Sequence, residues 1–588
     1  MYSDLLAKQR KRRDKPQLSC NPCRKRKVRC DRKLPCETCV SRGEDGNCVF
    51  APHLFKSDQA RTQDRIASNE DVPSVADALH SALDSTGRTR ANVHQQTSVD
   101  GEGWAAMAED QPPQWPELLH GLREGTSLKR MLASVPSKPE VDRLVSKYFN
   151  SLDLAVWVTH PPTFQEEYDR FWEDHSGVSP NWLSMLFSVL CLATDLLLQP
   201  NEPLPLEKCE EQKRVSIFRR CSAQCLLLGD YTRPSTYTAE ALLLYFFTEL
   251  IQLQDANFGL QIVLTSIIRV AMKMGYHRDS SHSPHISIFV GEMRRRVWTI
   301  LVQFDTLVSL QIGLPRMINE RDCDTQLPRN IPAEEMNVQM TTLPPTRPES
   351  GNSPASYMRS RTKLVSVLAK IHDHFTTARP MPYETVIALH EMLDAEHAAL
   401  PPGLKVTASS RVTESAGAVM RSISLDLLYQ KSRCVLHRGY MTPQNRLSWE
   451  TCIDAALAII RHQTYVYNET KPSGLLHGHL WKLTYMAAYD FLLGSMILGI
   501  GLQSEVESSN GRQTDMRKAL EDSNIIWTAW YTKVKGYKQI LDSVKHMMNR
   551  ATKTGSRIPP REDSEQNMMA IAFNDQFGTS LAGAYRPN

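Results

Sequence analysis

The chain has 588 residues, of which 41% are apolar and 23% are charged. This composition is ordinary for a globular protein, and the length is sufficient for several structural units. The net charge of +4 is unevenly distributed, because residues 1–50 hold 14 Lys and Arg against 6 Asp and Glu, while the remainder carries a net −4. A basic end on a mildly acidic body indicates a nucleic-acid contact confined to that end.

Membrane and secretory classes are not supported by the sequence. Residues 1–15 contain no apolar core of the kind that a secretory signal has. The two most apolar runs, 183–198 and 486–502, contain Asp195 and Asp490 and are short for a membrane span. We therefore expect buried helices there, a soluble intracellular protein, and 13 cysteines that are metal ligands or reduced thiols rather than disulfides.

Residues 1–19 form a basic arm that contains the run KQRKRRDK at 8–15. Such a run is typical of a nuclear localisation signal or a phosphate-binding arm, and it can also be a solvated charge run. The arm is therefore expected to direct the protein to the nucleus, to bind phosphates, or both.

Six cysteines fall in residues 20–50, and their spacing repeats a C-x-x-C pair followed by a third cysteine. Two thiolates at this spacing suit one tetrahedral zinc. One zinc would leave two cysteines unused, and two separate zincs would need eight. Six thiolates satisfy two Zn²⁺ ions if two of them bridge both metals. The predicted ligands are Cys20, Cys23, Cys30, Cys36, Cys39 and Cys48.

Five of the six residues between Cys23 and Cys30 are cationic, which places positive charge around a cluster with a net charge of −2. The stretch CNPCRKRKVRCDRKLPCETCVSRGEDGNC resembles the DNA-binding domain of the fungal zinc binuclear-cluster transcription factors. The resemblance implies a short helix that enters the major groove and reads a GC-rich, CGG-like triplet. It also implies Lys27 as the main base reader with Arg26 beside it, and phosphate contacts from Arg24, Lys25 and Arg29. The alternative is a zinc module that binds protein or is purely structural.

Residues 51–125 are polar and rich in Pro and Gly, so we expect a mostly disordered linker. One segment, 72–84, places Val72, Val75, Leu79 and Leu83 on one helical face. This is under two heptads, so it is either a dimerising seam or a short transient helix, and homodimerisation is left open.

From about 126 to 550 the apolar pattern is helical, and we expect an all-α regulatory body. In 258–276 apolar residues recur with helical spacing before Gly275, a stop signal. Further helices are expected at 181–198, 239–251, 290–311, 417–437, 448–466 and 481–501.

A second stretch, about 140–335, resembles the fungal-specific transcription factor domain, although Thr299 replaces an aromatic residue that many members have. The matching residues are Gly275, His277, Arg278, Asp279, Glu292, Arg294, Arg295, Arg296, Trp298, Asp305, Gly313, Pro315, Asp324, Pro328 and Asn330. We expect the arginines to form structural ion pairs with Glu292 and Asp305 rather than a second nucleic-acid site.

The sequence offers few candidate catalytic residues. Histidines two apart at 372–374 and 477–479 lie on different sides of a helix. Cys221 and Cys225 are expected to be core thiols. No phosphate-binding loop, dinucleotide fingerprint or G-x-S-x-G motif is present in the sequence.

The prediction is thus a mostly α, non-enzymatic, nuclear transcription factor of RNA polymerase II genes, as the resemblance implies, with a coactivator or small-molecule effector left open. The alternative is a helical sensor or enzyme that its zinc module localises. The expected domains are a basic arm at 1–19, a zinc cluster at 20–50, a linker at 51–125, a transcription factor domain at 126–335, a Pro/Ser-rich loop at 336–358, a further helical part at 359–554 and a tail at 555–588.

Overall fold

The computed structural model describes most of the chain between residues 20 and 531, and Lys545 beyond it. Between 20 and 531 the residues not described are 27, 32, 34, 44–47, 49–115, 124, 154, 198–204, 254–257, 350, 378–380, 407–412, 443, 478–484 and 504–509. The chain divides into two compact units, Met1–Gln111 and Pro112–Asn588. Every regular element in the described part is a helix, so the mostly α prediction is confirmed.

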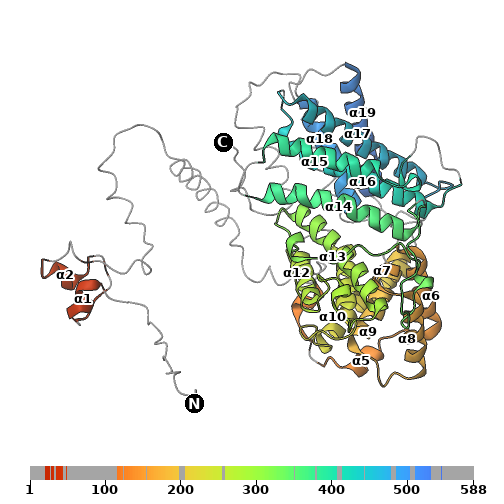
Figure 1. Cartoon of the computed structure of the whole chain (residues 1–588), viewed down its shortest axis with the longest axis horizontal. Coiled ribbons are helices and arrows are strands. Elements are labelled where there is room, and N and C mark those ends of the chain that lie inside the picture. The colour runs from red at the N-terminus through yellow and green to blue at the C-terminus, as the bar shows by residue number, and fades with distance from the viewer. Residues whose placement is uncertain are drawn as a thin grey trace, which may run out of the picture. The chain divides into compact units, whose positions relative to one another are not determined.

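Two short helices lie in the described part of the first unit, α1 (Asn21–Arg26) and α2 (Glu37–Val40), each at one of the two C-x-x-C pairs (Figure 1). The two helices pack on one another around the cysteines, which form the hydrophobic core of this unit. Among the described residues of this unit, Val28 and the half-buried Cys30 pack against these thiols. A core of this size needs a metal to hold its fold.

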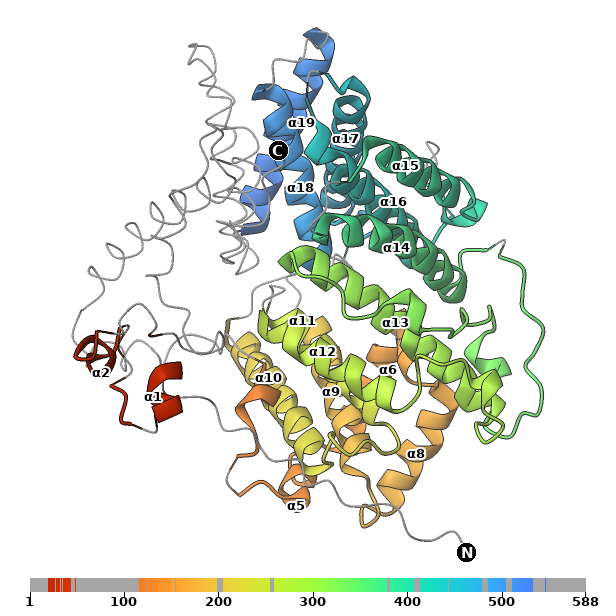
Figure 2. The same cartoon turned by 60° about the vertical axis from the view of Figure 1, so that its left-hand side comes forward.

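The second unit begins with helices that surround α9, whose Leu190 is fully buried. Helices α6, α10 and α11 pack against α9, and α12 and α13 continue the group (Figure 2). The elements are η2 (Glu117–His120), α5 (Leu128–Leu132), α6 (Lys138–Ser151), α7 (Ala155–Val158), α8 (Pro161–Glu173), α9 (Pro180–Leu197), α10 (Pro205–Leu228), α11 (Thr238–Leu253), α12 (Phe258–Lys273), η3 (Ser280–His282), α13 (Ile288–Ile312), η4 (Glu320–Asp322) and η5 (Ala333–Glu335).

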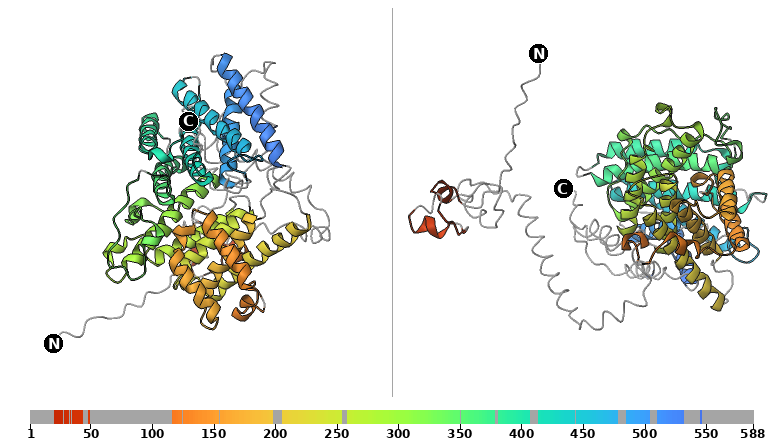
Figure 3. Two further views of the ribbon diagram at one scale, coloured as in Figure 1. Left: turned by 90° about the vertical axis from the view of Figure 1, so that its right-hand side faces the viewer. Right: turned by 90° about the horizontal axis from the view of Figure 1, so that it is seen from below.

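A second group of helices follows, and α14 packs on α13 to join the two groups (Figures 2 and 3). Within it α16, α17 and α18 pack on one another, α15 covers α14 and α16, and α19 covers α17 and α18. The elements are α14 (Pro354–Thr376), α15 (Tyr383–Ala398), η6 (Pro402–Leu404), α16 (Ala416–His437), η7 (Arg438–Tyr440), α17 (Arg446–Glu469), α18 (Tyr485–Gln503) and α19 (Asn510–Tyr531).

The helices expected from apolar periodicity are present as α9, α11, α12, α13, α16, α17 and α18. Gly275 ends α12 as expected: its φ is +82°, and the N–H of Tyr276 donates to the carbonyl of Ala271. The apolar runs of α9 and α18 lie in the core, where Leu190 and Ile497 are buried. None of the helices in the described part is long and apolar enough to span a bilayer.

One expected loop boundary differs from the structure, and some expected segments lie outside the described residues. The Pro/Ser-rich segment 336–358 is irregular only until Ser353, because α14 begins at Pro354. The segment 72–84 and the tail from 555 lie outside the described residues. The proposed domain boundaries remain predictions.

Candidate metal centre and nucleic-acid interface

The two C-x-x-C pairs each lie at the start of a short helix. Cys20 directly precedes α1, which contains Cys23, and Cys36 is the N-cap of α2, which contains Cys39. A helix start turns the chain so that the first and fourth residues approach each other, which brings the two thiols of each pair together. Asp31 supports the start of α2 by accepting a hydrogen bond from the N–H of Glu37 at 3.2 Å, a role that no sequence motif reveals.

The Sγ atoms of Cys20, Cys23, Cys36 and Cys39 all lie within 4.8 Å of one another. Cys20 Sγ lies 3.8 Å from Cys36 Sγ and 3.8 Å from Cys39 Sγ, and Cys23 Sγ lies 3.6 Å from Cys36 Sγ. A tetrahedral zinc with Zn–S bonds of about 2.3 Å separates its sulfurs by about 3.8 Å. The thiol spacing therefore fits zinc.

The remaining two cysteines lie beside Cys36. Cys30, with Asp31, forms a second group of potential ligands that includes Cys36. The N–H of Cys36 donates to Cys48 Sγ at 3.2 Å. Five of the six cysteines are buried and Cys30 is half-buried. The six sequence-predicted cysteines thus gather in one cluster, with Cys20 and Cys36 at its centre.

The thiols differ in acidity. Burial, with the neighbouring Cys20 and Cys36 thiols, raises the pKa of Cys23 to about 12. Burial acts in the same direction on Cys36, but hydrogen bonds with the Cys39 backbone and with neighbouring thiols outweigh it and lower the pKa of Cys36 to about 6. Since zinc binds thiolates, metal binding here is coupled to proton release.

The predicted DNA-contacting cations of the described part lie on α1 and just after it. Lys25 and Arg26 are exposed near its end, and Arg29 is exposed in the segment that follows. Arg24 lies within α1, and Lys27 lies outside the described residues. Two helices and a metal-sized thiol cluster thus present an exposed basic surface, which suits phosphate and guanine acceptors.

The arginine triplet in the body is structural. Arg295 Nη2 lies 2.7 Å from Asp279 Oδ1, and this contact holds the pKa of Asp279 well below its usual range. Arg296 pairs with Glu292 at 3.7 Å, and the guanidinium of Arg294 lies 5.0 Å from the ring centre of Tyr276. The expected ion pairs with Glu292 are confirmed.

Asp305 does not pair with the triplet, contrary to expectation. Its carboxylate is buried and accepts hydrogen bonds from the N–H groups of Met317 and Ile318. Gly313, with φ of +71°, ends α13 and turns the chain back toward Asp305. Asp305 therefore holds in place the segment that follows α13.

The other candidate metal ligands do not assemble. His372 is buried and bonds the carbonyl of Leu314, and His374 is exposed. Cys221 and Cys225 are buried on α10. Within the described residues, every group of three or more His, Cys, Asp or Glu close enough to share a metal lies in the N-terminal cluster.

Comparison with known proteins agrees with this arrangement. Residues 18–57 match the model of the fungal Zn(2)-Cys(6) binuclear cluster domain, and residues 145–398 match that of the fungal specific transcription factor domain. Among curated proteins, the Zn(2)-C6 fungal-type transcription factor mpsB of Macrophomina phaseolina (strain MS6) is 36% identical over 83% of this chain and 74% of its own length.

Two further relatives cover more of the chain. The Zn(2)-C6 fungal-type transcription factor pigI of Monascus ruber is 30% identical over 98% of this chain and 85% of its own length. The pyrrolocin cluster transcription factor fsdR of Fungal sp. (strain NRRL 50135) is 32% identical over 88% of this chain and 82% of its own length. These relatives are transcription factors and not enzymes. The chain belongs to the fungal Zn(2)-C6 transcription factors, which bind DNA through a zinc-holding cysteine cluster.

Proposed function

We propose that the six cysteines hold two Zn²⁺ ions, with Cys20 and Cys36 shared between them. One ion takes Cys20, Cys23, Cys30 and Cys36, and the other takes Cys20, Cys36, Cys39 and Cys48. The observation that carries this proposal is the thiol geometry, because Cys36 approaches Cys20 and Cys23 through Sγ, groups with Cys30, and contacts Cys48 through its backbone N–H. Zinc supplies structural cross-links, and the chain supplies the DNA contacts.

The DNA contacts come from the basic surface at α1. Lys27 and Arg26 donate to the O6 and N7 acceptors of guanine in a GC-rich, CGG-like triplet. Arg24, Lys25 and Arg29 hold phosphates, and the arm at 1–19 adds phosphate contacts or directs the protein to the nucleus. Nuclear localisation is typical of this family, and the regulated genes are those of RNA polymerase II.

The target genes form a biosynthetic cluster in this proposal. Support comes from the relative named as the transcription factor of the pyrrolocin cluster, which is similar over 88% of this chain. Genome-wide mapping of DNA bound by the protein tests the point, since binding sites should concentrate within one group of neighbouring genes.

The reading of DNA is tested with the full-length zinc-loaded protein and duplexes selected from a random pool. Lys27→Ala should lose roughly 1–3 kcal/mol of discrimination between the preferred and a random duplex. Arg24→Ala should weaken binding to both duplexes about equally. It should also lower the slope of the binding constant against salt concentration, on logarithmic axes, by about one. Lys33→Ala is the control, because Lys33 lies outside α1, is exposed, and pairs with Glu37 of α2 at 3.3 Å. If Lys27→Ala weakens both duplexes alike, Lys27 is not a base reader.

A further inference from the structure

The segment that follows α1 carries both a proposed phosphate contact and a proposed zinc ligand, because Arg29 directly precedes Cys30. Residues 28–31 are not helical, so the direction of their backbone depends on contacts with the rest of the unit. On the side of α1, the N–H of Val28 donates to the carbonyl of Cys23 at 3.1 Å. This hydrogen bond holds the start of the segment but not the peptide group between Arg29 and Cys30.

A contact from α2 holds that peptide group. The hydroxyl of Thr38 donates to the carbonyl of Arg29 at 3.1 Å. A Thr hydroxyl in a helix commonly bonds a carbonyl three or four residues earlier in the same helix, whereas the hydroxyl of Thr38 bonds one nine residues earlier, outside α2. Thr38 is half-buried and Arg29 is exposed, so the hydroxyl fixes the backbone of Arg29 and leaves its side chain accessible.

Asp31 joins the other side of Cys30 to the same helix. Cys36 is the N-cap of α2, but its thiol belongs to the cysteine cluster and makes no capping hydrogen bond. The carboxylate of Asp31 accepts from the N–H of Glu37 at 3.2 Å instead, and so satisfies a helix-terminal donor. The first two residues of α2 therefore hold the chain immediately before and immediately after Cys30.

These hydrogen bonds matter for Arg29 because its guanidinium is a rigid fork on a side chain with several rotatable bonds. Such a side chain reaches a given phosphate oxygen only if its backbone has a defined place and direction. A zinc on Cys30 would fix the sulfur atom. The direction of the peptide group between Arg29 and Cys30 would still depend on the hydroxyl of Thr38.

We propose that Thr38 is a positioning residue for DNA binding, and that its hydroxyl directs the backbone of Arg29 so that this arginine reaches a phosphate. This role rests on the phosphate contact proposed above for Arg29. It gives the second C-x-x-C half a part in DNA binding, although the proposed DNA contacts come from the first half. Phosphate contacts carry no sequence information, so loss of the hydroxyl should weaken binding to preferred and random duplexes alike.

The test uses full-length zinc-loaded protein with a preferred and a random duplex. Thr38→Val keeps the shape of the side chain and removes the hydroxyl. It should weaken binding to both duplexes about twofold to tenfold, the usual effect of losing one neutral hydrogen bond. It should also lower the slope of the binding constant against salt concentration, on logarithmic axes, by at most about one. Thr38→Ser retains the hydroxyl and should bind both duplexes as the wild type does.

Zinc content separates positioning from a purely structural role. In native mass spectrometry, Thr38→Val should hold as many zincs as the wild type. A loss of zinc would mean that the hydroxyl stabilises the cluster, and it would overturn the proposal. Ser41→Ala is the matched control, because Ser41 Oγ donates at 3.3 Å to the carbonyl of Thr38 and not to that of Arg29. It should retain both zinc content and DNA affinity.

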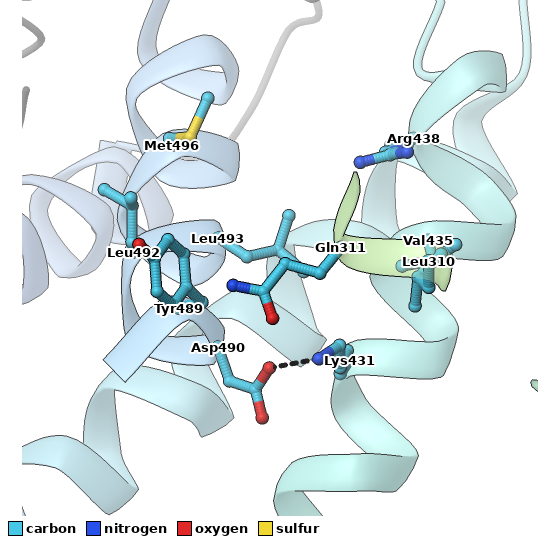
Figure 4. A pocket seen from close by; sticks show the side chains of 10 residues that line it. All are labelled: Leu310, Gln311, Lys431, Val435, Arg438, Tyr489, Asp490, Leu492, Leu493 and Met496. Atoms are coloured by element: carbon cyan, nitrogen blue, oxygen red, sulfur yellow. Dashed lines mark ion pairs between the residues drawn. The ribbon is translucent and has the colours of Figure 1, made fainter. Parts of the chain in front are cut away.

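A second control lies in the helical body. Leu493 of α18 is buried and lines a cavity of about 40 Å³ where the end of α13 meets α16, η7 and α18 (Figure 4). Leu493→Val removes one methylene group beside this cavity and should lower the urea midpoint of the protein. It should leave the DNA affinity and the salt dependence unchanged, which shows that reduced stability alone does not reproduce the effect of Thr38→Val.

Double variants decide whether Thr38 acts through Arg29. In an Arg29→Ala background, Thr38→Val should cause no further loss of DNA binding, because the guanidinium that Thr38 positions is gone. In an Arg24→Ala background it should have its full effect, since contacts with no shared partner add. Equal effects in the two backgrounds would overturn the role of Thr38 and leave the phosphate contact of Arg29 standing. If Arg29→Ala alone binds DNA as tightly as the wild type, the proposed phosphate contact is wrong, and the role of Thr38 is wrong with it.

Discussion

Cys36 and Cys48 differ in position although both belong to the cluster. Cys36 Sγ lies 3.8 Å from Cys20 Sγ and 3.6 Å from Cys23 Sγ. Cys48 is the last cysteine of the cluster in the sequence, and its Sγ accepts a hydrogen bond from the N–H of Cys36. If Cys36 is shared by two zincs, Cys36→Ala leaves each ion with three thiolates, while Cys48→Ala leaves one ion fully coordinated. We expect native mass spectrometry to find two zincs in the wild type, about one in Cys48→Ala and none in Cys36→Ala.

Cys323→Ala is the control for this comparison, because Cys323 is a half-buried thiol of the second unit. It should retain both zincs. A single zinc in the wild type would contradict the binuclear assignment, and one retained zinc in Cys36→Ala would contradict the sharing of Cys36.

Counting thiols in the sequence predicts six ligands and two ions, because zinc coordination is fixed at four. The structure gathers these cysteines, and the number of ions stays a prediction. The count could not predict which thiols are central, since that depends on how α1 and α2 pack. Asp305 shows the same limit in the body. Its charge suggested an arginine partner, but a carboxylate can equally accept backbone N–H groups, and the turn at Gly313 brings those of Met317 and Ile318 to it.

At the scale of elements, periodic apolar residues predicted helices such as α12 well, because one face of the helix must be buried. The start of α14 was not predicted, because Ser and Pro occur both in loops and at helix starts. Here Ser353 is the N-cap, its Oγ accepts the N–H of Ser356 at 3.1 Å, and Pro354 is the first helical residue. The same residues therefore end the loop and begin the helix.

Helices α15, α16 and α17 are joined by a buried chain of polar side chains. His437 Nε2 lies 3.0 Å from His390 Nδ1, and His437 Nδ1 lies 2.9 Å from Ser448 Oγ. Burial, followed by the charges of His390 and Arg433, lowers the pKa of His437 from 6.5 to about 4. The unfolded chain therefore binds a proton more readily than the folded chain between these pH values, so folding stability falls as the pH decreases through this window.

We expect the urea midpoint of the wild type to decrease from pH 7 to pH 4.5, and His437→Gln to reduce this dependence. The pKa shift of His437 corresponds to a change of roughly 3 kcal/mol at most in the free energy of unfolding. Burial also lowers the pKa values of His160 and His372, so part of the dependence should remain. The matched control is His374→Gln, because His374 is exposed on α14. An unchanged pH dependence in His437→Gln would show that His437 does not titrate in this window.

The whole molecule consists of a small cysteine unit and a large helical unit, Met1–Gln111 and Pro112–Asn588. This division was predictable from the sequence, because the cysteine cluster and the apolar periodicity occupy separate stretches. Assembly was not predictable. The candidate seam at 72–84 lies outside the described residues and, at under two heptads, is too short to hold a dimer alone.

Selectivity for genes nevertheless favours two DNA-binding units in one complex. A triplet recurs about every 64 base pairs by chance, so one unit reading one triplet cannot select genes. Two linked units raise selectivity even through a flexible tether. If a dimer forms, we expect the helical body to supply most of the interface. Residues 1–111 should then sediment as a monomer and bind single triplets weakly, while the full-length protein should prefer paired triplets.

Sedimentation of both proteins, each with and without duplex, distinguishes the outcomes. Duplexes with one triplet, with two triplets and with a scrambled sequence provide the matched controls for DNA. A stable dimer of residues 1–111 would mean that the short seam is sufficient and the body is not needed. A full-length monomer that binds one triplet as tightly as two would mean that dimerisation is not how the protein gains selectivity. In that case further contacts, such as those of the basic arm at 1–19, must supply it, and deleting the arm should then reduce discrimination between the single-triplet and scrambled duplexes.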